Sequence, residues 1–140
     1  MIILDTNVVS ALTRDTPEPR VVAWLDRQPR TSVWITAVTV LEFRFGLDLM
    51  PEGHRASALR DRFDRMLAEV LARRVAPFDE AAATATGSLM AARQRRGQSQ
   101  ELRDSMIAGI ALTRRAVIAT RNVRHFADLG PTLIDPWAAA

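Results

Sequence analysis

The chain has 140 residues, of which 48% are hydrophobic, and this supplies enough apolar material for one domain around a single core. It contains no cysteine, and no apolar stretch approaches about 18 residues, which excludes disulfide frameworks, cysteine-based zinc sites and membrane-spanning helices and favours a cytoplasmic protein. The net charge is only +3 and all 19 basic residues are arginine, so any mechanism that depends on a lysine is excluded.

The first third of the chain predicts two short strands, each followed or preceded by a helix. Ile2 to Leu4 form a brief apolar run, typical of a strand buried on both faces, and the apolar spacing after residue 7 predicts a helix. Asp5 lies at the turn between them, where an aspartate can cap a helix, so Asp5 alone is equally consistent with a structural role. A second helix is expected to begin near Pro19, and a second strand to span residues 32–36.

Residues 37–50 fit two interpretations. Apolar residues alternate with other residues over 43–49, which is typical of a strand, but two apolar stripes at helical spacing also run through the segment. We favour a helix, because the run is long for a strand and Thr36 can cap it. The second stripe, formed by Leu41, Phe45 and Leu49, then indicates a surface for a partner or a second copy of the chain.

The second half predicts three long helices that alternate with short extended segments. The expected elements are an amphipathic helix over 53–73, a brief extended piece at 75–78, a helix capped by Asp79 and ended by Gly97, a helix from its cap Ser99 to about Arg115, and strands at 116–120 and 132–137. Strands that alternate with helices indicate an α/β fold with a central, mostly parallel sheet of four to five short strands, covered by helices on both faces.

Polar side chains follow two of the predicted strands at the point where each strand ends. Asp5 comes directly after the first strand, and Thr120, Arg121 and Asn122 come at the end of the strand at 116–120. Because ligands of an open α/β sheet gather at the carboxyl ends of its strands, we expect these side chains at one functional edge.

Two further carboxylates stand in apolar surroundings. Glu42 lies within the apolar segment TVLEFRF, and Asp104 shares a helix face with Ile107 and Ala108. If Asp5 and these two groups converge to about 4 Å, each pair repels by roughly 4 kcal/mol at an effective dielectric constant of 20, so protons or a cation must compensate. Carboxylate oxygens without cysteine are hard ligands that suit Mg²⁺ or Mn²⁺, and these ions accompany phosphoryl chemistry.

Five blocks of the sequence resemble the PIN-domain nucleases, most closely the VapC-type toxins of bacterial toxin-antitoxin pairs and their FitB-like relatives. In chain order the blocks are MIILDTNVVSAL, ITAVTVLEFRFGL, LRDSMIAGIAL, VIATRNVRHF and DPW. The resemblance implies that residues 1–140 form a single PIN domain, an α/β/α sandwich with an acidic pocket that binds one or two Mg²⁺ ions for RNA cleavage.

The resemblance also implies roles for individual residues. Its acids fall on Asp5, Glu42 and Asp104, which are the expected metal ligands and, with Asn122, the expected catalytic residues. Asn122 stands where many relatives have a fourth aspartate, and since it supplies no charge a stable second metal ion is not expected. The expected substrate-binding residues are Thr6, Thr120 and Arg121.

The implied function is that of an Mg²⁺-dependent endoribonuclease, with Mn²⁺ as an alternative ion, which acts as the toxin of a type II toxin-antitoxin system. Expected partners are the RNA substrate, a cognate antitoxin protein and a second copy of the chain in a homodimer, with DNA contacted only through the antitoxin and no membrane. The alternative is a catalytically weak PIN-fold binding module that acts through partner or nucleic-acid binding. A metal-free ribonuclease would need a pair of placed histidines, whereas His54 and His125 are both expected at the surface.

Overall fold

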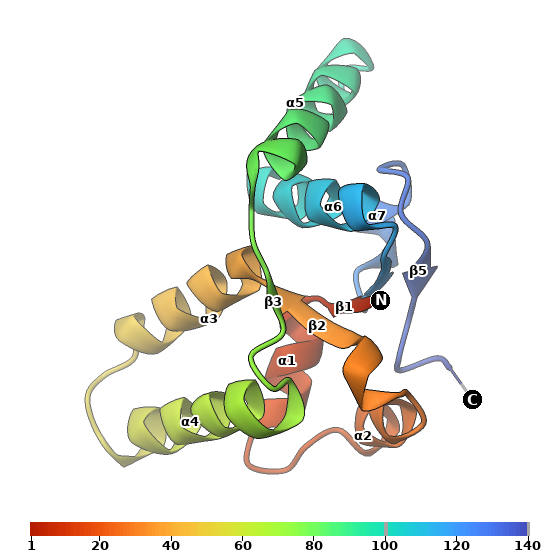
Figure 1. Ribbon diagram of the computed structural model, residues 1–140. Coiled ribbons are helices and arrows are strands. Elements are labelled where there is room, and N and C mark those ends of the chain that lie inside the picture. The colour runs from red at the N-terminus through yellow and green to blue at the C-terminus, as the bar shows by residue number, and fades with distance from the viewer. Residues whose placement is uncertain (100, 140) are drawn as a thin grey trace.

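A five-stranded parallel sheet runs through the centre of the computed structural model, which describes residues 1–99 and 101–139 (Figure 1). The order of the strands is β3-β2-β1-β4-β5, and each neighbouring pair is parallel. The strands are β1 (Ile2–Leu4), β2 (Val33–Thr36), β3 (Val75–Ala76), β4 (Val117–Ala119) and β5 (Leu133–Ile134). The predicted α/β class is therefore confirmed, and the sheet is entirely parallel in the part of the chain that the structure describes.

Helices cover both faces of this sheet, as the sandwich prediction requires. They are α1 (Thr6–Thr13), α2 (Pro19–Asp26), α3 (Ala37–Leu49), α4 (His54–Arg65), α5 (Glu80–Arg95), α6 (Leu102–Arg114) and α7 (Val123–Phe126). Successive residues of β1 point to opposite faces, so Leu4 packs in a hydrophobic cluster with α1, α2 and α4, whereas Ile3 packs with α6. Figure 1 shows α5 and α6 on one side of the sheet and α1, α2 and α4 on the other.

Helix starts follow local capping chemistry, and three of the predicted caps are confirmed. Asp5 accepts a hydrogen bond from the backbone N–H of Thr6 at 2.8 Å, and Thr36 accepts one from Thr39 at 3.1 Å. Asp79 accepts from Ala82 at 2.9 Å. Each bond satisfies a donor that the first turn of a helix leaves free. The helical interpretation of residues 37–50 is thus confirmed, and the helix begins where Thr36 predicts.

Several predicted boundaries differ from the structure, two of them by more than the end residues of an element. Ser99 is not the cap of α6, which begins at Leu102 with Glu101 as its N-cap; the Glu101 carboxylate accepts from the backbone N–H of Arg103 at 3.3 Å. Residue 100, which the predicted helix includes, lies outside the described residues. The predicted helix over 53–73 is α-helical at 54–65 and continues as a π-helical turn, Met66–Val70. None of the helices within the described ranges is both long and apolar enough to cross a membrane.

The parallel pairing of β1 with β4 aligns the two strand ends that carry polar residues. Leu4 is in register with Ala119, and the backbone N–H of Asp5 donates to the carbonyl of Ala119 at 2.9 Å. Asp5 and Thr120 therefore lie side by side at the carboxyl edge of the sheet. The helix that follows β2, α3, starts from the same edge because parallel strands all end there.

Candidate active site

Asp5 is buried at this edge, and it receives hydrogen bonds only from uncharged donors among the described residues. Its exposed fraction is 5%. One carboxylate oxygen accepts from the Thr6 backbone N–H at 2.8 Å, and the other accepts from the Thr120 hydroxyl at 2.8 Å and from the Asn7 side-chain amide at 3.3 Å. Burial raises the pKa of the Asp5 carboxyl, the bonds from Thr120 and Thr6 oppose this, and the negative charge of Asp104 adds to it.

Glu42 extends from α3 toward the same region. The Thr6 hydroxyl donates to its Oε1 at 2.8 Å, so the residue after Asp5 orients a second carboxylate. Its Oε2 lies 3.6 Å from a terminal nitrogen of Arg103, which reaches across from α6. Glu42 is thus held on both oxygens, by a neutral hydroxyl on one and by a guanidinium on the other.

Asp104 lies in the first turn of α6 and faces His125 of α7. Its Oδ2 is 3.3 Å from the Nδ1 of His125. Burial raises the pKa of Asp104, and the neighbouring charges of Glu101 and Glu42 also raise it, while His125 lowers it. Asp104 thus interacts electrostatically with both other predicted acids, because Glu42 raises its pKa and Asp104 in turn raises the pKa of Asp5.

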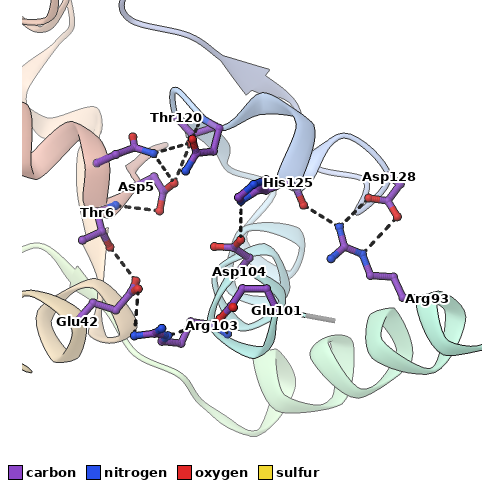
Figure 2. A network of polar contacts seen from close by, with 12 residues as sticks. Asp5, Thr6, Glu42, Arg93, Glu101, Arg103, Asp104, Thr120, His125 and Asp128 are labelled. Carbon is purple, nitrogen blue, oxygen red and sulfur yellow. Dashed lines mark hydrogen bonds and ion pairs between the residues drawn. The ribbon is translucent and has the colours of Figure 1, made fainter. Parts of the chain in front are cut away.

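Figure 2 shows the carboxylates of Asp5, which follows β1, of Glu42 in α3 and of Asp104 in α6 around one region. The structure thus brings the three predicted acids to one region. Within residues 1–99 and 101–139, however, no three histidine or acidic side chains are close enough together to hold a metal ion as they stand. Glu42 is turned to Arg103, and Asp104 is turned to His125.

The predicted residues after β4 have different surroundings from one another. The side chain of Thr120 is fully buried and donates to Asp5 at 2.8 Å, so it orients that acid. The Arg121 guanidinium is exposed and lies 5.0 Å from the centre of the Trp137 ring, a cation–π arrangement. Asn122 is exposed at the start of α7, and its backbone N–H donates to the Thr120 hydroxyl at 3.0 Å.

Arg103 and His125 are parts of this site that the sequence does not predict as functional. His125 is at the surface, as expected, with 60% of its side chain exposed, but it also contacts Asp104. Arg103 is half-exposed and bridges Glu42 and Glu101. The one signal for either residue is position, because Arg103 directly precedes Asp104 and His125 follows the polar residues after β4.

Arg93 fixes the segment that carries His125. It is a buried residue in the last turn of α5, where it donates to Asp128 at 2.8 Å and to the backbone carbonyl of His125 at 2.7 Å. The exposed Arg96 donates to the other oxygen of Asp128 at 3.0 Å. Two arginines thus anchor α7 to α5 on the side away from Asp5, as Figure 2 shows for Arg93.

The sequence and the fold of this chain match those of known proteins. The family model described as "PIN domain" matches residues 2–130. The chain belongs to the PIN-domain family. It is 38% identical over 140 residues to "VapC ribonuclease Y4jK" of Sinorhizobium fredii, with both chains covered completely, and 34% identical over 137 residues to "Toxin FitB" of Neisseria gonorrhoeae, covering 98% of this chain and 99% of that one.

The fold of this PIN domain also matches a solved toxin-antitoxin complex. The structure of FitAB bound to an IR36 DNA fragment superposes with a TM-score of 0.89 at 33% identity, covering 100% of this chain and 98% of that one. The sequence resemblance to VapC-type and FitB-like proteins is therefore confirmed along the whole chain.

Nucleases of the PIN-domain family generally depend on a divalent metal ion. The residues of this PIN domain fit such an ion by the chemistry of their donors, because Asp5, Glu42 and Asp104 supply only hard carboxylate oxygens. In the described residues the hydrogen bonds to the buried Asp5 carboxylate come only from uncharged donors, so no ion pair neutralises its charge. A bound metal ion would share Glu42 with Arg103 and Asp104 with His125, each of which contacts one oxygen of its carboxylate.

Proposed function

We propose that this PIN domain is an Mg²⁺-dependent endoribonuclease that hydrolyses RNA phosphodiester bonds as the toxin of a type II toxin-antitoxin system. The observation that carries the proposal is the set of three carboxylates facing one another at the carboxyl edge of the sheet. It is supported by full-length relatives that are named a ribonuclease and a toxin. We further propose that residues 1–140 act as a single PIN domain in the cytoplasm.

Asp5, Glu42 and Asp104 are the proposed ligands of Mg²⁺, with Mn²⁺ as an alternative. When bound, the ion lowers the pKa of a water molecule and neutralises negative charge on the scissile phosphate. The protein's own groups prepare the acids, because the Thr6 hydroxyl orients Glu42 and the Thr120 hydroxyl orients Asp5.

The remaining proposed residues act toward the RNA from the end of β4. Asn122 completes the proposed catalytic set through its neutral side-chain amide, and its exposure at the start of α7 supports this role. Arg121 is the proposed contact for an RNA phosphate, since its guanidinium is exposed and a planar guanidinium matches phosphate oxygens. Thr6 is half-buried, and it is proposed to line the pocket beside Glu42.

The proposed partners are a cognate antitoxin protein and a second copy of the chain. The likeness to the FitAB complex with DNA supports an antitoxin that also carries the DNA contact. A homodimer is supported by the second stripe of α3, because Leu41, Phe45 and Leu49 are 58%, 57% and 69% exposed on one helix face.

RNA cleavage by the purified chain tests this proposal. Cleavage is expected with Mg²⁺ or Mn²⁺ and none in excess EDTA, and Asp5→Asn and Asp104→Asn are each expected to lower the rate by at least about a hundredfold. Asp64→Asn is the matched control, because this exposed acid pairs with Arg44 away from the site and its loss is expected to leave the rate unchanged.

Cleavage that survives EDTA, or that survives both substitutions in the site, overturns the metal-dependent nuclease. A chain that binds its antitoxin but cleaves no RNA under any metal condition instead supports the binding-module alternative.

A further inference from the structure

Arg103 lies between the acids of the site, and nothing so far assigns it a function. It is the residue before Asp104 on α6, and its side chain reaches across to α3 (Figure 2). One terminal nitrogen lies 3.6 Å from Glu42 Oε2, and its Nε lies 3.5 Å from Glu101 Oε1. With 46% of the side chain exposed, Arg103 is held by ion pairs at the surface of the site.

Arg103 supplies the positive charge next to Glu42. The other oxygen of Glu42 accepts from the neutral Thr6 hydroxyl, so within the described residues Arg103 is the cation that pairs with Glu42. A divalent ion that takes Glu42 as a ligand therefore meets a guanidinium that already occupies the same carboxylate. Two cations at one carboxylate repel each other, so they compete.

The ion pair is suited to being exchanged. Exposed pairs at such separations contribute little to stability and are readily broken. The arginine side chain is long, and its planar group presents paired donors that fit phosphate oxygens as well as carboxylates. An Arg103 side chain displaced from Glu42 stays beside Asp104, because its backbone is fixed in the first turn of α6.

We propose that Arg103 is a switching cation: it holds Glu42 while the site has no metal ion, yields that carboxylate to a divalent ion, and then contacts a phosphate of the bound RNA. This inference rests on the proposed nuclease function and adds to it a substrate-contacting residue. It also explains why three acids that face one another do not form a ready ligand cluster in the described structure.

Metal binding measured without RNA tests the first half. In calorimetric titrations with Mn²⁺, Arg103→Gln is expected to bind the ion roughly three- to tenfold more tightly than the unsubstituted chain, since a competing cation is removed. Arg114→Gln is the matched control: it removes the same charge from the other end of α6, where Arg114 lies 4.0 Å from Asp79, and is expected to leave Mn²⁺ affinity unchanged.

The sign of the effect separates this inference from a structural role. If Arg103 merely positions Glu42, its loss misplaces a ligand and weakens Mn²⁺ binding. Weaker or unchanged binding in Arg103→Gln overturns the switching cation. No Mn²⁺ binding by the unsubstituted chain, by contrast, overturns the proposed metal-dependent function itself.

Steady-state RNA cleavage with saturating Mn²⁺ tests the second half. Arg103→Gln is expected to raise KM for RNA about tenfold, because a phosphate contact is lost, while Arg114→Gln leaves KM unchanged. Arg103→Lys keeps the charge but not the paired donors. Its Mn²⁺ affinity is expected to equal that of the unsubstituted chain, and its KM is expected to lie between those of the unsubstituted chain and Arg103→Gln. A KM that does not change in Arg103→Gln overturns the phosphate contact.

Discussion

Asp5 and Asp128 lie at opposite ends of one polar network, and the protein compensates their charges in opposite ways (Figure 2). Asp128 is paired with Arg93 at 2.8 Å and with Arg96 at 3.0 Å, and the hydrogen bond from Arg93 lowers its pKa. Within the described residues Asp5 accepts hydrogen bonds only from uncharged donors, and its burial raises its pKa. Arginines neutralise Asp128, whereas within the described residues no ion pair neutralises Asp5.

The difference shows what each region contributes. Arg93 donates hydrogen bonds to Asp128 and to the backbone carbonyl of His125. This region therefore anchors α7, which carries His125 opposite Asp104. Around Asp5, hydroxyl and backbone donors fix the direction of the carboxylate without cancelling its charge. Two groups of the same residue type are thus fixed in different ways, Asp128 by ion pairs and Asp5 by uncharged donors.

The largest expected effect comes from breaking the arginine anchor. Arg93→Met leaves the His125 carbonyl and part of Asp128 without a donor, and is expected to lower the free energy of unfolding by about 2 to 3 kcal/mol. Urea denaturation measures it, with the exposed neighbour Arg95→Met as control, expected within about 0.5 kcal/mol of the unsubstituted chain. Equal stability of the two variants contradicts the anchoring role.

Removing the uncompensated charge is expected to act in the opposite direction. Asp5→Asn is expected to raise the stability of the metal-free protein by about 1 kcal/mol, or its Tm by about 3 °C, because a buried ionised carboxylate is replaced by a neutral amide. Thermal unfolding in EDTA measures the change, and Asp64→Asn at an exposed ion pair serves as control. A lower Tm for Asp5→Asn points instead to a purely structural cap.

The sequence predicts the acids of the candidate site better than their partners. Asp5, Glu42 and Asp104 stand out because each is a charge within apolar surroundings, and Thr36 and Asp79 stand out because capping is decided within one turn. The start of α6 is missed because Ser99 and Glu101 are both capable caps, and Glu101 gains a second contact with Arg103 that the sequence does not reveal.

Partners that belong to distant elements depend on how the helices pack. Arg103 meets Glu42 only because α6 and α3 meet at the carboxyl edge of the sheet, and Arg93 meets Asp128 only because α5 lies beside the segment after α7. Long arginine side chains make such contacts with little dependence on spacing in the chain. The sequence contains nineteen arginines, and it does not show that Arg93, Arg96 and Arg103 are the ones that pair with these acids.

The pH dependence of stability sharpens the comparison, because the two shifts have opposite signs. The pKa of Asp5 is raised above its ordinary 3.8, so the stability gained by its protonation is complete below that value and is lost as pH rises through the raised pKa. The pKa of Asp128 is lowered from 3.8, so its contribution is present above that value and is lost as pH falls through the lowered pKa.

Urea unfolding of metal-free variants between about pH 7 and pH 3 measures both windows. The advantage of Asp5→Asn over the unsubstituted chain is expected to shrink as pH falls toward 3.8, whereas the deficit of Asp128→Asn is expected to persist to that point and shrink only below it. Parallel pH profiles for the two variants contradict a raised pKa of Asp5 together with a lowered pKa of Asp128.

The smallest expected effect separates the two arginines that share Asp128. Arg96 has 47% of its side chain exposed, against 9% for Arg93, so solvent already screens its ion pair. Arg96→Gln is therefore expected to lower the free energy of unfolding by less than about 0.5 kcal/mol, and raised salt is expected to remove the difference. If urea denaturation instead gives Arg96→Gln the same cost as Arg93→Met, the anchor depends on charge at Asp128 and not on the buried donors that Arg93 directs to α7.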